Sequence, residues 1–207
     1  MKQVIRTLAS LGDELVLAPE RWLAAAGNAE GVPLGDLVTE RRDRVLPTTE
    51  IVVDVTHARD GYLDLAAARR ASSEAGARSA KKRGEANDVI VSRLRPYLRQ
   101  VALVPSDAPP LALSTEFYVL APREDGEDLA WLVPYLLSAA TQSVLAAAQE
   151  GGHHPRVPQA SLFALKVPEA LVANRAALAK RARAALDDLY GAMDRWTALL
   201  HTQQLPR

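Results

Sequence analysis

The chain has 207 residues and no cysteine, and its 25 basic and 25 acidic side chains give a formal net charge of zero. That length suits one well-buried domain, or one domain with an extension, and a chain without cysteine needs no oxidising compartment. The first residues lack the apolar core of a signal peptide, and the apolar stretches are too short or too interrupted for a membrane span. We therefore expect a cytoplasmic protein without membrane contact.

The zero net charge hides an uneven distribution of charge along the chain. Residues 69–99 hold nine basic and three acidic side chains, whereas residues 106–150 hold one basic and seven acidic side chains. A basic stretch can supply contacts to nucleic-acid phosphates even on a neutral protein. The alternative interpretation is a solvated loop whose charge is incidental.

The first part of the chain predicts short elements separated by turns and a charged loop. In chain order we expect two short helices within residues 3–26, a turn-rich break at 27–33, a charged loop at 39–50, a strand at 51–55, a turn with a second short strand at 61–65, and a helix or mobile loop at 66–83. Pro19 suits the first turn of the second helix, whereas Gly76 weakens the case for a helix at the end of this part.

Three apolar runs in the middle of the chain predict three strands. They are Val89–Val91, Val101–Val104 and Phe117–Leu120, and they are rich in β-branched and aromatic residues. Arg93 and Arg95 follow the first run, so an extended chain would direct both guanidinium groups to one face. That arrangement suits the binding of a polyanion.

The second half of the chain predicts two helices on either side of a loop and a last strand. We expect a helix at 127–149, which Pro134 restarts or kinks, a stiff loop at 152–158, a strand at 161–167 and one long helix at 169–203. The apolar positions of the long helix follow heptad-like intervals and are Leu171, Leu178, Ala182, Ala185, Leu189, Ala192, Trp196 and Leu199. This spacing favours an apolar contact with a second helix, and the alternative is a helix packed on its own domain.

The central segment also carries a resemblance to a known family. The sequences N-D-V-I-V-S-R-L-R-P-Y-L-R-Q-V-A-L-V, from Asn87 to Val104, and L-S-T-E-F-Y-V-L, from Leu113 to Leu120, resemble the target recognition domain of Type I restriction-modification specificity subunits. That family typically shows a Gly-Asp-Ile-Leu strand, a Ser-Arg-hydrophobic-Arg-Pro turn and a later Ser-Thr-Glu-Phe strand. Asn87 stands here in place of the usual glycine, and asparagine also accepts turn geometry.

The resemblance implies a fold, a function and partners. The expected fold is α+β, with a mixed β-sheet DNA-binding domain over residues 1–168 and a coiled-coil-type helix over residues 169–207 for dimerisation or partner docking. The implied function is sequence-specific binding of double-stranded DNA in phage defence, without a cofactor or catalytic residues of its own. DNA methyltransferase and endonuclease subunits would be the partners. The full subunit of the family has two such halves, so a single half is expected to form a homodimer through its helix.

Two sets of residues carry these expectations. The residues expected to contact DNA, mostly at phosphates, are Lys81, Lys82, Arg83, Arg93, Arg95, Arg99, His153, His154 and Arg156. The residues expected in the dimer interface are Leu178, Leu189, Trp196 and Leu199. A structural role remains open for the loop at 151–158, and Arg93 or Arg95 could instead brace the sheet by pairing with Asp88 or Glu116.

Signals for catalysis are scarce. The sequence has no phosphate-binding glycine loop, GxSxG motif or Walker lysine, and the adjacent His153 and His154 cannot easily share a metal. Asp54, Asp88 and Glu116 could suggest the metal site of a nuclease, but no lysine stands at a nuclease-like spacing. Two alternatives to DNA reading therefore remain, which are a protein-interaction module of a defence system that has lost DNA reading and, less favoured, a metal-dependent nuclease.

Overall fold

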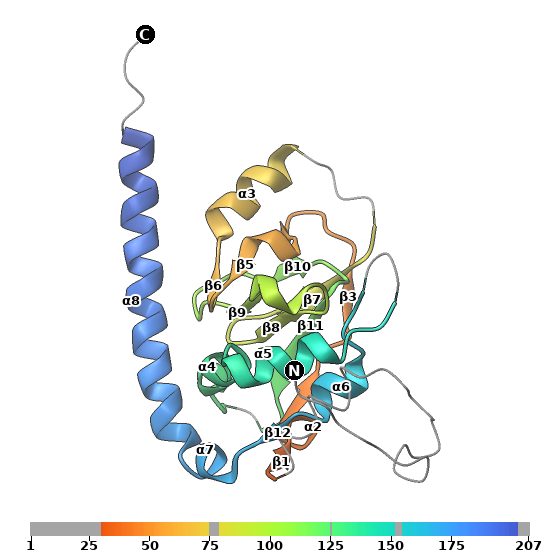
Figure 1. The fold of residues 1–207 in the computed structure, drawn as a ribbon. Coiled ribbons are helices and arrows are strands. Elements are labelled where there is room, and N and C mark those ends of the chain that lie inside the picture. The colour runs from red at the N-terminus through yellow and green to blue at the C-terminus, as the bar shows by residue number, and fades with distance from the viewer. Residues whose placement is uncertain (1–29, 75–78, 125, 152–154, 203–207) are drawn as a thin grey trace, which may run out of the picture.

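Two four-stranded sheets, two two-stranded sheets, several short helices and one long helix make up the described part of the fold in the computed structural model, which confirms the expected α+β class (Figure 1). The structure describes residues 30–74, 79–124, 126–151 and 155–202. The strands are β1 (Val32–Pro33), β2 (Val38–Glu40), β3 (Arg44–Val45), β4 (Ile51–Val53), β5 (Ala58–Arg59), β6 (Tyr62–Leu63), β7 (Lys81–Gly84), β8 (Val89–Ser92), β9 (Val101–Leu103), β10 (Leu111–Leu113), β11 (Phe117–Pro122) and β12 (Lys166–Val167). The helices are α2 (Leu34–Leu37), α3 (Leu65–Glu74), α4 (Leu132–Leu136), α5 (Ala139–Ala147), α6 (Gln159–Phe163), α7 (Glu169–Ala173) and α8 (Arg175–Thr202), with 3-10 turns η2 (Val55–His57), η3 (Pro96–Leu98) and η4 (Leu129–Trp131).

The three central apolar runs form β8, β9 and β11, which make an antiparallel sheet together with β2 in the order β2-β11-β8-β9, so all three predicted strands are confirmed. Side chains alternate across this sheet. Val91 and Tyr118 enter one core cluster with the helices, whereas Ile90 and Val119 enter a second cluster with the other sheet. Both faces are therefore buried, which explains why these strands read as continuous apolar runs and not as alternating ones.

The second sheet has the order β3-β7-β10-β4, and its only parallel pair is β10 with β4 among the described strands. β4 confirms the strand expected at 51–55, and α3 lies against it, where the Ser72 hydroxyl accepts a hydrogen bond from the Val52 amide at 2.9 Å. The segment expected as a helix or loop at 66–83 contains both α3 and the strand β7. The segment expected as a loop at 39–50 likewise contains the end of β2 and all of β3.

The helix expected at 127–149 is divided into η4, α4 and α5. The segments Leu129–Leu136 and Ala139–Ala147 meet at 71°, and Ser138 caps α5 by accepting the Thr141 amide hydrogen bond at 3.2 Å. The break therefore lies at a capping serine, whereas Pro134 sits inside the first turn of α4, where proline is tolerated.

Among the described residues no single helix is long and apolar enough to cross a membrane, and only this bent pair has the required combined length and composition.

The strand expected at 161–167 is wrong for most of its length. Helix α6 occupies the segment up to Phe163, and only β12 is extended, where it pairs antiparallel with β1. Pro158 precedes the first turn of α6 with the fixed φ that suits this position, and Leu162 buries one face of the helix. A helix places one side chain per turn in the core, so the apolar residues of this segment do not need a strand.

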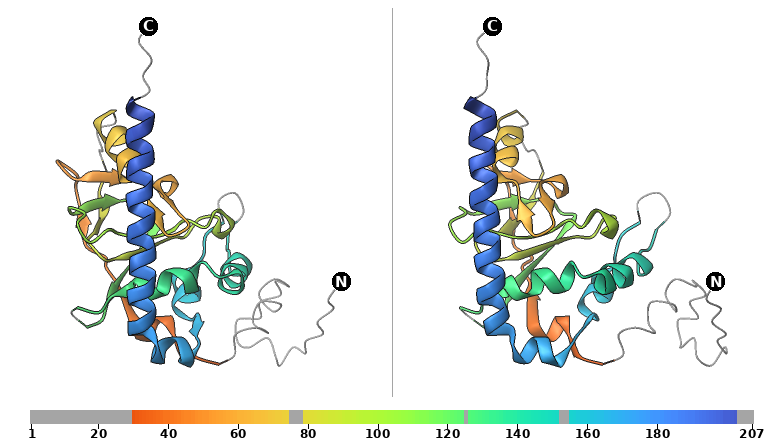
Figure 2. Two further views of the ribbon diagram at one scale, coloured as in Figure 1. Left: turned by 90° about the vertical axis from the view of Figure 1, so that its left-hand side faces the viewer. Right: turned by 60° about the vertical axis from the view of Figure 1, so that its left-hand side comes forward.

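The long C-terminal helix packs on its own domain over its first part. Asn174 separates α7 from α8, so the single helix expected from residue 169 is interrupted once. α8 then runs along one side of the globule to the level of α3 (Figure 2). Ala179 and Leu186 are buried, and the Tyr190 hydroxyl accepts from the Leu63 amide at 2.9 Å and donates to the Leu103 carbonyl at 2.8 Å.

The heptad-like face of α8 therefore has two environments. Leu178 packs against the core of its own chain, which is the alternative that the sequence left open. Beyond the Tyr190 anchor, Trp196 and Leu199 are 56% and 58% exposed, and Leu189, just before it, is 37% exposed. The exposed apolar side chains of this face thus lie between Leu189 and Leu199, over about three turns of the helix.

Candidate nucleic-acid interface

The turn after β8 is compact, so the expected extended alternation of Arg93 and Arg95 is wrong. Arg95 (φ 43°) and Arg99 (φ 54°) adopt left-handed conformations on either side of η3. The Leu98 amide donates to the Arg95 carbonyl at 2.9 Å, and the Arg99 amide donates to the Pro96 carbonyl at 2.8 Å. Proline fixes the first residue of this turn, and arginine in the left-handed region is uncommon, so the strain is concentrated in one short basic loop.

Beside this turn, four cations and two carboxylates meet at one end of the central sheet. This basic cluster consists of Arg42, Lys82, Arg93 and Arg156 with Glu40 and Glu116. Strands β2, β7, β8 and β11 and the segment before α6 supply or closely flank these side chains. The cations outnumber the carboxylates, so the cluster presents a positive potential to an approaching anion.

Arg93 occupies the middle of the basic cluster and is incompletely paired. Its guanidinium lies over the ring of Tyr118, 5.5 Å from the centroid, and its Nε is 3.9 Å from the Glu116 carboxylate. That Nε is buried and has no hydrogen-bond partner among the described residues. A buried donor without a partner costs about 1–3 kcal/mol, so the placement of Arg93 over Tyr118 carries a local cost in stability.

Arg156 makes the strongest contact of the basic cluster. Its Nε and Nη2 donate to the two oxygens of Glu116 at 2.9 and 2.7 Å, a two-point geometry that fits carboxylate and phosphate alike. The hydrogen bonds from Arg156 lower the pKa of Glu116, and burial opposes this effect. The main chain of Arg156 also bridges to Leu94, which ties this segment to the turn after β8.

Replacement of Glu116 by glutamine tests this contact through the dependence of stability on pH. Because the folded pKa of Glu116 is lowered, its contribution to the free energy of unfolding is present above the ordinary value of 4.5 and is lost as the pH falls below it. We expect Glu116→Gln to be less stable than wild type near about pH 7 and the difference to shrink towards about pH 3. Urea denaturation across this range measures it, with the exposed Glu124→Gln as control. A constant difference at every pH would contradict the assigned pairing.

The other predicted cations lie in different settings. Lys82 is 12% exposed and donates to Glu40 at 2.9 Å and to the Phe117 carbonyl at 2.7 Å, so it braces the two sheets against each other. Arg99 pairs with Asp60 and donates to the Leu137 carbonyl at 2.9 Å, which anchors the turn. Arg83 pairs with Glu85 at 2.9 Å and is about half exposed.

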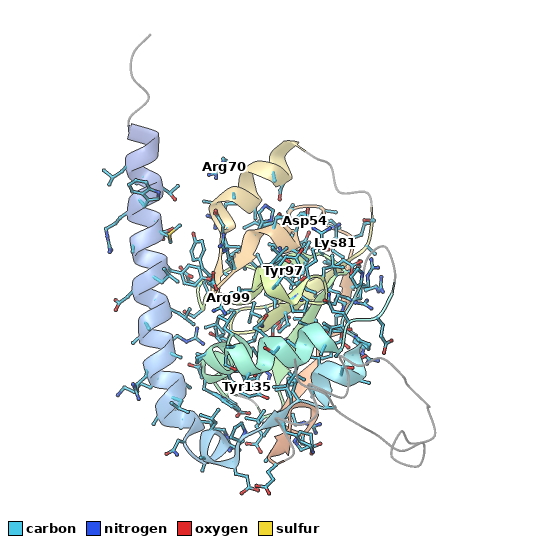
Figure 3. All side chains as sticks on the ribbon, in the orientation of Figure 1. Asp54, Arg70, Lys81, Tyr97, Arg99 and Tyr135 are labelled. Atoms are coloured by element: carbon cyan, nitrogen blue, oxygen red, sulfur yellow. The ribbon has the colours of Figure 1, made fainter. Side chains whose placement is uncertain are left out.

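Arg95 and Lys81 are the predicted cations that stay available. Within the described ranges, no ion pair of either side chain is present, and Arg95 is exposed on the turn. Figure 3 shows Lys81 on the opposite side of Tyr97 from Arg99 in that view. His153 and His154 lie outside the described residues.

The three carboxylates that suggested a nuclease do not meet. The Asp54 amide donates a hydrogen bond to His57 Nδ1 at 3.0 Å, the Asp88 carboxylate pairs with Arg41, and the Glu116 carboxylate pairs with Arg156. Among the residues that the structure describes, no group of three or more His, Cys, Asp or Glu side chains could hold a metal ion. Two of the three carboxylates that suggested a nuclease are thus engaged in separate ion pairs.

Two arginines after β2 that the sequence did not single out, Arg41 and Arg42, also form ion pairs. Arg41 donates to both oxygens of Asp88 at 2.9 and 3.2 Å, and Asp88 is 1% exposed. Arg42 is 70% exposed, pairs with Glu40 at 3.0 Å and donates to Gln159 at 3.0 Å, which joins the basic cluster to α6. The run Glu40-Arg41-Arg42-Asp43-Arg44 falls within the segment expected as a charged loop, and its density of arginine is the signal that the sequence offers.

No protein-family model and no curated protein matches this chain, but solved structures are similar to it. One comes from work described as the structural basis of complex assembly and conformational transition of the type I R-M system, with 23% identity over 84% of this chain and 47% of its own, and a TM-score of 0.48. Another is the HsdS subunit from Thermoanaerobacter tengcongensis, with 22% identity over 85% of this chain and 50% of its own, and a TM-score of 0.45. The chain spans about half the length of each of these two structures.

Proposed function

We propose that this chain is a DNA-specificity module, which binds a defined sequence of double-stranded DNA and directs catalytic partner subunits to it. The observation that carries the proposal is the basic cluster, because two of its members, Arg93 and Glu116, lie in the segments that resemble a target recognition domain. β8 ends at Ser92, Arg93 and Arg95 follow in the turn, and Glu116 precedes β11. The strands hold the cations in place, which keeps the entropic cost of a DNA contact low.

Cations of the basic cluster that already pair with a carboxylate suit contacts to DNA phosphates, as do Arg95 and Lys81. Arg156 donates two hydrogen bonds to the Glu116 carboxylate, and two oxygens of a phosphate offer the same geometry to a guanidinium group. Arg93 lies beside it, and its side chain is 34% exposed. Contacts to phosphates would fix the register of the module on the duplex, and contacts to base edges in a groove would supply sequence specificity.

Catalysis would belong to partner subunits, namely a DNA methyltransferase and an endonuclease. In this arrangement residues 1–168 form the DNA-binding domain and the helix from residue 169 serves dimerisation or partner docking. The apolar residues Leu189, Trp196 and Leu199 support the second role, because they are spaced by seven and three and share one face of α8. A second copy of the chain, related by a two-fold axis, is the partner that we propose for this face.

The double variant Leu189→Asp with Trp196→Asp tests self-association. Both side chains are exposed, so the charges should leave the fold intact while removing the apolar contact. We expect wild type to sediment as a dimer and the variant to sediment as a folded monomer with weaker affinity for a two-part DNA site. Lys180→Ala with Arg181→Ala on the same helix serves as control. A monomeric wild type at micromolar concentration would contradict self-association and point to a helix from another protein.

Selection of bound duplexes from a random pool tests the proposed function itself. The full chain is incubated with the pool, alone and with a co-expressed methyltransferase subunit, and the retained DNA is sequenced over several rounds. We expect enrichment of a short defined motif, arranged as an interrupted palindrome if the chain dimerises. A pool that stays unchanged in both arms would contradict DNA reading and favour a protein-interaction module.

A further inference from the structure

The tip of the turn after β8 exposes an aromatic side chain among cations. Tyr97, the middle residue of η3, is 68% exposed, the largest exposed fraction of any large hydrophobic residue in the described part of the chain. Leu98 beside it is 38% exposed. Arg95 lies two residues before Tyr97 on the same turn, and Arg99, which pairs with Asp60, lies two residues after it.

This tip is held firmly although its side chain is not packed. Pro96 is buried, and Arg99 anchors the end of the turn through Asp60 and the Leu137 carbonyl. The start of the turn is tied down by Ser92, whose hydroxyl accepts from the Leu94 amide at 3.1 Å. A fixed backbone that presents an exposed tyrosine loses little conformational entropy when the ring is covered.

We propose that Tyr97 packs its ring against a deoxyribose or base edge of the bound duplex, next to the phosphates that Arg93 and Arg95 contact. This inference rests on the proposed DNA binding and deepens it, because it names a residue that contacts DNA without an ionic bond. Tyrosine suits such a place, since its ring covers apolar sugar and base surface while its hydroxyl stays hydrated. Arg95, which is exposed on the same turn and has no ion pair among the described residues, favours DNA over an apolar protein surface, because a buried protein interface would leave its charge unpaired.

The contact should differ from those of the arginines in its dependence on salt. When an arginine contacts a phosphate, counterions are released from the DNA. Loss of that arginine therefore makes the negative slope of log affinity against log salt shallower by roughly 0.9. A tyrosine on sugar or base releases none. Its loss should lower affinity by the same factor at every salt concentration, and more strongly for the selected sequence if the ring touches a base.

The test compares Tyr97→Ala, Tyr97→Phe and Arg95→Ala with wild type on a selected duplex and a scrambled one, over a series of salt concentrations. We expect Tyr97→Ala to bind the selected duplex roughly tenfold more weakly with an unchanged salt slope, Tyr97→Phe to bind nearly as wild type, and Arg95→Ala to show a reduced slope. Thermal denaturation confirms that each variant is folded, which the exposure of Tyr97 favours.

The outcomes separate this inference from the proposed function. If wild type binds both duplexes and folded Tyr97→Ala binds them equally well, the tyrosine contact is wrong while DNA binding stands, and a protein partner becomes the better candidate for the tip. If folded wild type binds neither duplex, the proposed function fails and the inference fails with it. A Tyr97→Ala variant whose salt slope falls as in Arg95→Ala would also contradict the inference, because the tyrosine would then act through the phosphate contacts.

Discussion

Arg41→Met should destabilise the folded chain by about 3 kcal/mol, because it leaves a buried carboxylate without its cation. Asp88 is 1% exposed, accepts both hydrogen bonds from Arg41 and also accepts the Glu85 amide at 2.8 Å. Asn87, in the left-handed conformation at φ 70°, shapes the turn that brings Asp88 into this position. The pair therefore connects the end of β2 to the start of β8, and Arg93 follows the other end of β8.

The loss of stability in Arg41→Met should grow as the pH rises, and the direction of this change follows from the pKa of Asp88. Burial raises the pKa of Asp88, and the hydrogen bonds from Arg41 oppose that rise. Without Arg41 the folded pKa rises further above the ordinary value of 3.8, so the folded chain binds the proton more tightly than the unfolded chain. Between the unfolded and folded pKa values the free energy of unfolding then decreases as pH rises.

Urea denaturation of Arg41→Met near about pH 7 and about pH 4 measures both effects. Arg42→Met is the matched control, because the next residue in the chain carries the same charge but is 70% exposed, and exposed pairs contribute about 0–1 kcal/mol. A loss for Arg41→Met as small as that for Arg42→Met, or a deficit that shrinks towards neutral pH, would contradict this role of the pair.

Arg93→Ala with Arg95→Ala should weaken DNA binding by about 3 kcal/mol, roughly a hundredfold, since each charge-assisted hydrogen bond contributes about 1.5–3 kcal/mol. If both side chains contact phosphates, the loss should be similar for all sequences. If one of them reaches a guanine edge, an additional loss of about 1–3 kcal/mol should appear for the selected sequence only.

Fluorescence anisotropy with selected and scrambled duplexes measures this loss. Lys180→Ala with Arg181→Ala removes the same charge from the exposed surface of α8 and should leave affinity nearly unchanged. Because Arg93 lies over Tyr118 and near Glu116, thermal denaturation must accompany the titration. Unchanged affinity would remove both residues from the DNA contact, and a loss of folding would show that they brace the sheet.

The strands of the central sheet could be predicted because burial on both faces leaves a local signal. Val89–Val91 and Val101–Leu103 are apolar at every position, so their strand character does not depend on distant residues. β7 carried no such signal, because Lys81, Lys82 and Arg83 are charged and become a strand only through pairing with β3 and β10. Strand formation there is decided by tertiary contacts that a local pattern does not contain.

The candidate site was predictable in its residue types but not in its geometry. The arginines of the turn were recognisable from the motif, whereas the left-handed conformation of Arg95 is not encoded by any local preference of arginine. The pairs Lys82–Glu40 and Arg156–Glu116 join residues 42 and 40 positions apart, so neither could be read from spacing. No pattern in the sequence indicated the role of Tyr190 either. Its hydroxyl holds α8 against Leu63 and Leu103, which lie 127 and 87 positions earlier in the chain.

The affinity of the full wild-type chain for a selected and a scrambled duplex, measured over a series of salt concentrations, tests the central claim most directly. The account predicts that log affinity falls linearly with log salt for both duplexes, by roughly 0.9 for each phosphate contacted, and that a preference for the selected duplex persists at the highest salt. A folded chain that binds neither duplex at low salt, or that binds both equally at every salt concentration, would contradict it.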